Sequence, residues 1–305
     1  MSLRVLITGA AGFLGRYVSL AFKKAGASTC GIGHGAYGKE ELSLWGVDEW
    51  VQADVTVDTL EGIGGKFDVI AHCAGSGSVG FSFLHPMEDF QKTVESTLNV
   101  LEFMRRSNPE ARLIYPSSPA AQGDGNGTPL RETDPCTPES PYGVHKKIAE
   151  ELCRSYANVF GLQTTIVRFF SIYGEGLRKQ LLWDACNKML HGEPEACFWG
   201  TGEEVRDWIH VEDAASLVVF LSQASSKITL INGGLGIPYT IRDTLHRLRQ
   251  SLGISCALRF NMQTKTGDPK YYCADTTRLT QLQWKAAISL DAGLARYARW
   301  VKEQI

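Results

Sequence analysis

The chain lacks an excess of charge of either sign. Its 305 residues hold 31 Lys and Arg against 33 Asp and Glu, which gives a formal net charge of −2 and a pI near 6.4. A protein that binds nucleic acid or an anionic membrane through its overall field carries a clear basic surplus. We therefore expect neither nucleic acid nor a membrane among its partners.

The chain also lacks the segments and spacings that mark export, membrane insertion or metal binding. It has no basic and apolar leader and no uninterrupted apolar run of about 18 residues or more. Its eight cysteines form no CxxC pair, and its histidines show no metal-ligand spacing. We expect a cytoplasmic protein with reduced, mostly buried thiols and no metal.

A glycine triplet follows the first apolar run. The run from Leu3 to Ile7 predicts a strand buried on both faces, and Gly9-x-x-Gly12-x-x-Gly15 leads from it into a helical apolar pattern. Glycines at such a junction allow a tight turn and close approach of a pyrophosphate, whose charge the helix N-terminus attracts. The triplet therefore predicts a dinucleotide site, and a loop without a ligand is the less favoured interpretation.

Short apolar runs alternate with helical patterns through the first half of the chain. Strands are expected at Ser28 to Ile32, around Trp50 and Val51, and at Phe67 to Ala71, Arg112 to Tyr115 and Thr164 to Phe169, with helices at Met87 to Arg106 and Tyr142 to Phe160. This alternation predicts an α/β fold with a doubly wound parallel sheet. We expect a dinucleotide-binding domain over 1–174, to which 208–232 returns, and a smaller, discontinuous α+β substrate domain over 175–305.

Tyr142 and Lys146 lie four residues apart on the second of these helices, so both side chains project from one face. A free tyrosine has a pKa of about 10, and lowering it by three units requires about 4 kcal/mol. One positive charge at about 4 Å supplies that much at an effective dielectric constant near 20. We expect Lys146 to lower the pKa of Tyr142 and make it a base; the alternative is an exposed tyrosine beside a solvated lysine.

Several ordered stretches match one known family over essentially the whole chain. They are Thr8 to Gly15, Ala53-Asp54-Val55, His72 to Gly75, Ser117-Ser118, Ser140 to Lys146, Arg168 to Gly174, Gly200 to Gly202 and Arg206 to Asp213. The chain resembles an extended short-chain dehydrogenase/reductase of the nucleotide-sugar epimerase and dehydratase group, similar to UDP-galactose 4-epimerase. The resemblance implies a Rossmann-like fold, an NAD or NADP cofactor, a nucleoside-diphosphate sugar as substrate and a homodimer.

The resemblance also implies roles for particular residues. Tyr142 exchanges a proton with the sugar, Lys146 holds the nicotinamide ribose, and Ser118 hydrogen-bonds the reacting oxygen unless it is only a turn residue. Arg206 grips the substrate's diphosphate unless it pairs with Glu203 or Asp207, and Ser171 stands at a substrate position. The implied cofactor-binding residues are Gly9, Gly12, Phe13, Leu14, Gly15, His34, Asp54, Val55, Ala74 and Gly75, together with Tyr142 and Lys146.

Departures from the family pattern narrow the reaction. Pro119 and Ala120 stand where the dehydratases carry an acidic pair, so elimination of water is not expected. Where the second strand ends, His34 stands in place of the acidic residue typical of NAD users. The His34 side chain is compatible with the 2′-phosphate of NADP. The alternative is that His34 is an ordinary loop residue with no role in cofactor binding. Thr93 and Gln122 replace further residues that are typical of the family.

The reaction that remains is reversible oxidation of a secondary alcohol. We expect an NAD(P)-dependent nucleotide-sugar epimerase that works by hydride transfer through a keto-sugar intermediate. One alternative is an NADPH-dependent reductase of 4-keto nucleotide sugars. Another is a non-catalytic, cofactor-binding regulatory protein, against which the Ser118, Tyr142 and Lys146 set argues.

Overall fold

Strands and helices alternate along the first half of the chain and build one parallel sheet, as the apolar pattern predicts. The computed structural model describes residues 2–35, 37–191, 194–224, 228–263 and 267–304. The chain divides into a first unit of residues 1–123, 132–169 and 214–231 and a second unit of residues 124–131, 170–213 and 232–305.

The first unit contains a seven-stranded sheet of order β11-β6-β5-β4-β1-β2-β3. Its strands are β1 (Arg4–Thr8), β2 (Ser28–Gly33), β3 (Glu49–Gln52), β4 (Val69–His72), β5 (Arg112–Ser117), β6 (Gln163–Phe169) and β11 (Leu230–Gly233). Strands β1 to β6 pair in parallel. The strand order reverses between β1 and β4, and in such sheets ligands bind beyond the carboxyl ends of the strands at that point.

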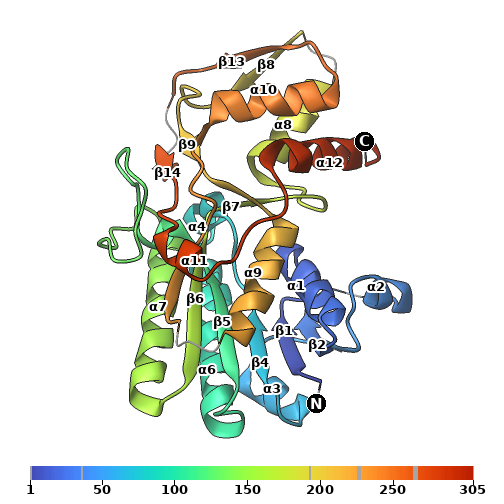
Figure 1. Cartoon of the computed structure of the whole chain (residues 1–305), viewed down its shortest axis with the longest axis vertical. Coiled ribbons are helices and arrows are strands. Elements are labelled where there is room, and N and C mark those ends of the chain that lie inside the picture. Colours follow the sequence, from blue (N-terminus) through green and yellow to red (C-terminus); the bar gives the residue numbers. More distant parts are fainter. Residues whose placement is uncertain (1, 36, 192–193, 225–227, 264–266, 305) are drawn as a thin grey trace. The chain divides into compact units, whose positions relative to one another are not determined.

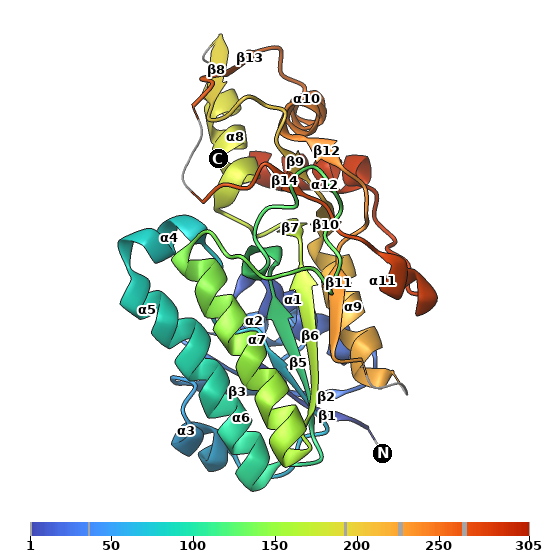
Figure 2. The same cartoon turned by 90° about the vertical axis from the view of Figure 1, so that its left-hand side faces the viewer.

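Helices cover both faces of this sheet. They are α1 (Phe13–Lys24), α2 (Lys39–Leu44), α3 (Val57–Ile63), α4 (Val79–Leu84), α5 (Pro86–Phe90), α6 (Ser96–Ser107), α7 (Pro141–Phe160) and α9 (Val211–Gln223), with a π-helical turn η1 (Gln91–Glu95) and a 3₁₀ turn η2 (Pro119–Ala121). Helices α3, α6 and α7 lie on one face, where Leu60, Leu101 and Cys153 pack with Ile70 and Leu113 of the sheet (Figure 2). Helices α1 and α9 lie on the other face (Figures 1 and 2).

The second unit is built from short strands and three longer helices. Its strands are β7 (Ser171–Tyr173), β8 (Glu195–Phe198), β9 (Val205–Arg206), β10 (Trp208–His210), β12 (Tyr239–Thr240), β13 (Ala257–Phe260) and β14 (Tyr271–Tyr272), and its helices are α8 (Gln180–Leu190), α10 (Ile241–Leu252), α11 (Thr277–Gln281) and α12 (Leu290–Lys302). The strands form sheets of two or three members. Helices α8, α10 and α12 pack on one another (Figure 1).

The predicted fold class is confirmed, whereas several element details differ. The helix expected from Met87 to Arg106 consists of α5, η1 and α6 in succession, with a π-helical turn at its centre. The first unit breaks at Phe169 rather than at 174, and residues 124–131 belong to the second unit. Residues 214–231 return to the first unit, close to the predicted 208–232.

Candidate active site

The glycine loop closes tightly between β1 and α1. Gly9 has a φ of +65°, and a Cβ at this position would lie 2.7 Å from the backbone nitrogen of Ala74. A Cβ on Gly15 would lie 2.1 Å from the carbonyl oxygen of Gly9. Only glycine fits either position, so the loop brings the helix N-terminus against the ends of β1 and β4.

The N-terminus of α1 is free to receive an anion. Its N-cap is Gly12, which offers no side-chain cap, and the first turn contains no acidic residue. The first amides of a helix point outward along its dipole and attract negative charge. Phe13 and Leu14 begin this helix, so their amides fit the predicted role of binding a pyrophosphate.

The ends of β2 and β3 lie side by side and bring together two predicted cofactor residues. The Nε2 atom of His34 lies 2.9 Å from Oδ1 of Asp54, and both side chains are largely exposed. A carboxylate is thus present beside His34, on the segment after β3. The neighbouring Val55 is half-buried, and its carbonyl accepts a hydrogen bond from the Asn99 amide at 3.0 Å.

The segment after β4 lies between the glycine loop and Lys146. The Ala74 amide donates to Oγ1 of Thr8 at 3.1 Å, and a Cβ on Gly75 would lie 4.0 Å from Nζ of Lys146. Thr8 also hydrogen-bonds Nδ1 of His72 at 2.7 Å. Burial, helped by the charge of Lys146, lowers the pKa of His72 to about 3, so His72 is a neutral part of the core.

The start of helix α7 places Tyr142 and Lys146 in the first turns of the helix. Ser140 caps it by accepting from the Gly143 amide at 3.1 Å, Pro141 occupies the first turn, and Oγ of Ser82 accepts from the Tyr142 amide at 3.0 Å. Tyr142 and Lys146 are consequently held in the first turns of α7, and both are buried.

The structure brings Ser118, Tyr142 and Lys146 together. Ser118 follows β5; its hydroxyl accepts from the Ala120 amide at 3.2 Å and acts on Tyr142 to lower the pKa of the phenol. Nζ of Lys146 lies 5.9 Å from the Tyr142 ring centroid and donates to the carbonyl of Pro116 at 2.9 Å. Their roles remain predictions, but the geometry places a hydroxyl, a phenol and an amine at one edge of the sheet.

The expectation that Lys146 lowers the pKa of Tyr142 is wrong for the protein alone. Burial raises the pKa of Tyr142 to about 12, which the Ser118 hydrogen bond opposes and the charge of Asp89 reinforces. Burial also lowers the pKa of Lys146 to about 8, against the charges of Asp89 and Glu150. The prediction from spacing did not include the loss of solvation of the Tyr142 phenol on burial. It also did not include the hydrogen bond that the Lys146 ammonium donates to the Pro116 carbonyl.

The predicted substrate residues Ser171 and Arg206 belong to the second unit. Ser171 begins β7, and its amide donates to the Asp207 carbonyl at 2.9 Å. The Arg206 guanidinium donates to Asp268 at 2.8 Å and to the Pro269 carbonyl at 2.8 Å. The ion pair of Arg206 is with Asp268, and not with Glu203 or Asp207, the two partners of the alternative interpretation.

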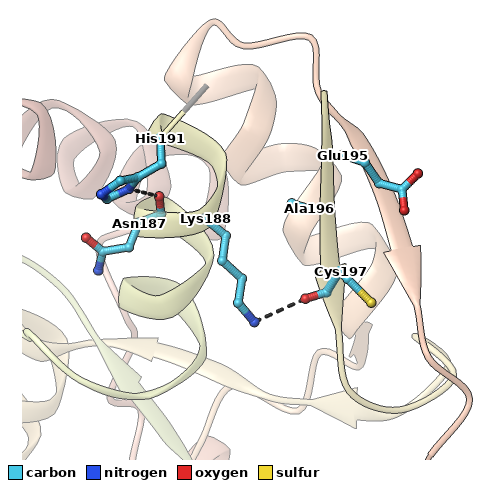
Figure 3. Close-up of a pocket in the computed structure, with 6 residues that line it drawn as sticks. All are labelled: Asn187, Lys188, His191, Glu195, Ala196 and Cys197. Carbon is cyan, nitrogen blue, oxygen red and sulfur yellow. Dashed lines mark hydrogen bonds between the residues drawn. The ribbon is translucent and has the colours of Figure 1, made fainter. Parts of the chain in front are cut away.

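The hollow drawn in Figure 3 lies in the second unit and involves none of the predicted site residues. It has a volume of about 400 Å³ and is lined by Asn187, Lys188, His191, Glu195, Ala196 and Cys197. Lys188 points across it and donates to the Cys197 carbonyl at 3.1 Å (Figure 3). Among the described residues, no three or more His, Cys, Asp or Glu side chains gather as a metal site requires. Nor does the described part contain a helix that is both long and apolar enough to cross a membrane.

Comparisons with known proteins place the chain in a family. A family model for the NAD dependent epimerase/dehydratase family matches residues 5–232. A putative UDP-glucose 4-epimerase of Methanocaldococcus jannaschii is 27% identical over 306 residues, 98% of each chain. A UDP-glucuronate 4-epimerase of Thermodesulfobacterium geofontis is 28% identical over 316 residues, 98% of this chain and 96% of that one.

Solved structures share the fold over the whole length. A UDP-glucuronic acid 4-epimerase from Bacillus cereus, in complex with UDP-glucuronic acid and NAD, matches with a TM-score of 0.88 and 24% identity over 99% of this chain and 100% of that one. The fold, the glycine loop and the family match agree, and the chain belongs to the NAD dependent epimerase/dehydratase family.

Proposed function

We propose that the protein is an NAD-dependent nucleotide-sugar epimerase that inverts the C4 hydroxyl of a UDP-sugar through a keto-sugar intermediate. The observation that carries this proposal is the Ser118, Tyr142 and Lys146 group beside a glycine loop, in a chain of this family. The curated relatives named above are 4-epimerases of UDP-glucose and UDP-glucuronate, and the chain spans nearly their full length.

The residues divide the proton chemistry among them. Tyr142 takes the proton of the sugar hydroxyl and returns it to the oxygen on the opposite face, while Ser118 holds that oxygen by a hydrogen bond. Lys146, when charged, stabilises the ionised Tyr142. NAD, when bound, would accept the hydride and return it, and the positive charge of its oxidised ring would lower the pKa of Tyr142.

NAD, rather than NADP, is the cofactor that the ends of β2 and β3 favour. The carboxylate of Asp54 lies beside His34 at the edge where the resemblance puts the adenosine half of the cofactor. A carboxylate accepts hydrogen bonds from ribose hydroxyls and repels a 2′-phosphate. The carboxylate of Asp54 therefore argues against the alternative of an NADPH-dependent reductase.

A homodimer and a cytoplasmic location complete the proposal. Large apolar side chains are exposed on neighbouring helices: Leu98 of α6 is 38% exposed, and Val144 and Ile148 of α7 are 40% and 36% exposed. A second copy would cover them. None of the eight cysteines forms a disulfide, in keeping with a reducing compartment.

The test is incubation of the NAD-loaded protein with UDP-glucose, UDP-glucuronic acid and UDP-N-acetylglucosamine, with the C4 epimers resolved by NMR. We expect turnover of at least one sugar, lowered by roughly 10³-fold in Tyr142→Phe. Tyr156→Phe is the matched control, because Tyr156 lies on the same helix and its hydroxyl donates to Glu102. NADPH consumption with a 4-keto sugar and no epimer would indicate the reductase, and nucleotide binding without turnover would indicate the regulatory protein.

A further inference from the structure

Two buried carboxylates flank Lys146 from opposite directions along helix α7. Glu150 lies one turn beyond Lys146 on the same helix, and Asp89 lies on α5, which packs against α7. Both are completely buried. The charges of both raise the pKa of Lys146, and Asp89 has the larger effect.

The charge of Glu150 is compensated by its own partners. Arg168 makes a two-pronged contact with it, from Nε to Oε1 at 2.9 Å and from Nη2 to Oε2 at 2.7 Å. Arg154 donates to Oε2 at 2.9 Å, and the Ser117 hydroxyl donates to Oε1 at 2.7 Å. Two guanidinium groups and a hydroxyl satisfy one carboxylate, which leaves Glu150 with a smaller effect on the pKa of Lys146 than Asp89 has.

Asp89 is held very differently. Its Oδ2 lies 2.6 Å from Nδ1 of His145, the residue that directly precedes Lys146. Its Oδ1 is buried and has no hydrogen-bond partner among the described residues. The ring of Phe90 packs edge-on against that of His145, with centroids 5.4 Å apart, and fixes the imidazole in place. A buried carboxylate with one unpartnered oxygen costs stability, and its charge is compensated by fewer donors than that of Glu150.

The remaining ionisable groups near Asp89 and Lys146 are exposed or are kept neutral by burial, as is Tyr115, whose ring centroid lies 4.9 Å from Nζ of Lys146 and whose pKa burial raises. On α5 and η1, Glu88 and Lys92 form an exposed pair with each other. His85 caps α5 through its backbone and packs its ring on Phe81. On the sheet side His72 is neutral, and burial raises the pKa of the Cys73 thiol to about 12, so it too is neutral. The Cys153 thiol of α7 is neutral for the same reason.

We propose that Asp89, held by His145, is a positioning residue that sets the pH range over which the Tyr142 and Lys146 pair works. The proposal rests on the proposed function in so far as Tyr142 is the base. A negative charge at Asp89 holds a proton on the pair, because it favours charged Lys146 and disfavours ionised Tyr142. The Tyr142 phenol and the Lys146 ammonium are neighbours, so the loss of one proton from either group affects the other. The pH at which the first proton leaves is therefore a property of the pair and not of one residue.

The variant that tests this is Asp89→Asn, which keeps the size of the side chain and an oxygen that can accept from His145. Removing the charge lets the pair lose its first proton more easily. We expect the rising limb of the kcat/KM profile against pH to move to lower pH by about one unit. Glu88→Gln removes the same charge one residue away on the exposed side of α5, and its profile should match the wild type.

A second measurement does not depend on turnover. The protein is labelled with ¹³C at the lysine carbon next to Nζ, the Lys146 signal is assigned with Lys146→Arg, and its titration is followed by NMR. The midpoint should fall by about one unit in Asp89→Asn and stay in place in Glu88→Gln. An unmoved midpoint in a folded Asp89→Asn protein overturns the inference.

The two proposals fail in different ways. Loss of activity in Asp89→Asn with an unshifted profile would mean that Asp89 only supports the fold, which also overturns the inference. Absence of epimerisation by the wild type at every pH would reject the proposed function, while the NMR midpoint would still decide whether Asp89 controls Lys146.

Discussion

The two units treat buried carboxylates in opposite ways. In the second unit Asp207 is completely buried and accepts from the amides of Leu235, Gly236 and Ala274 at 2.9, 2.8 and 3.1 Å. In the first unit Asp89 is equally buried but has one side-chain donor and one unused oxygen. A carboxylate surrounded by backbone amides organises loops, whereas one left partly unpaired beside a lysine acts on that lysine.

The largest effect expected in the second unit concerns Arg206 and separates binding from chemistry. Arg206→Ala should raise the KM for the UDP-sugar by roughly 10- to 100-fold and leave kcat within a few-fold, because a forked cation binds the diphosphate equally before and during the reaction. Steady-state kinetics measure both constants. Arg242→Ala is the control, since Arg242 pairs with Glu203 at the surface of the same unit. An unchanged KM in Arg206→Ala would leave Arg206 with only its structural pairing to Asp268.

The next effect sharpens the comparison between Asp207 and Asp89. Asp207→Asn places an NH₂ group against backbone amides that need an acceptor, so we expect the free energy of unfolding to fall by about 2 kcal/mol. Urea denaturation measures it. The pH profile of the folded variant should not move, in contrast to Asp89→Asn. If Asp207→Asn shifted the profile and kept its stability, the division between the two carboxylates would be lost.

The smallest effect concerns acid stability of the second unit. Burial acts to raise the pKa of Glu175, but hydrogen bonds from His210 and Arg296 lower it to about 2, below its ordinary 4.5. A lowered pKa gives stability that is complete above pH 4.5 and is lost as the pH falls toward 2. We expect unfolding at pH 3 to need roughly 1 kcal/mol less than at pH 5 from this group, a discounted figure because the side chain is 20% exposed.

The control for this effect is Glu175→Gln, studied by denaturant unfolding at both pH values. The variant should be less stable than the wild type at pH 5 and show a weaker dependence on pH. Equal slopes for the two proteins would assign the acid sensitivity to other carboxylates.

The sequence predicted what depends on local pattern and motif. The strand, glycine turn and helix at Gly9 to Gly15 follow from hydrophobic periodicity and from the sterics of glycine, and so does the parallel sheet. The start of α7 follows from Ser140 and Pro141, a cap and a first-turn proline. The Tyr142 and Lys146 pair was found because their spacing alone puts them on one face.

The remaining features depend on distant contacts or on burial. Asp268 pairs with Arg206 from 62 positions away, and Asp89 meets His145 across 56. Spacing along the sequence does not predict such distant pairs. For the pair of Asp89 and His145, the only hint in the sequence is that His145 lies between Tyr142 and Lys146. The direction of the Tyr142 shift was missed because the loss of solvation is a property of the folded site.

The strand β11 has a consequence for how the protein is made. It is the edge strand of the sheet beside β6, yet it comes from residues 230–233, after a long excursion through the second unit. A ribosome must therefore synthesise about three quarters of the polypeptide before β6, which pairs with β5 on its other side, acquires β11 as its second neighbour, and until then that edge offers unpaired backbone groups to other nascent chains. Chaperone dependence and losses to aggregation during overexpression should accordingly concentrate in this interval of translation.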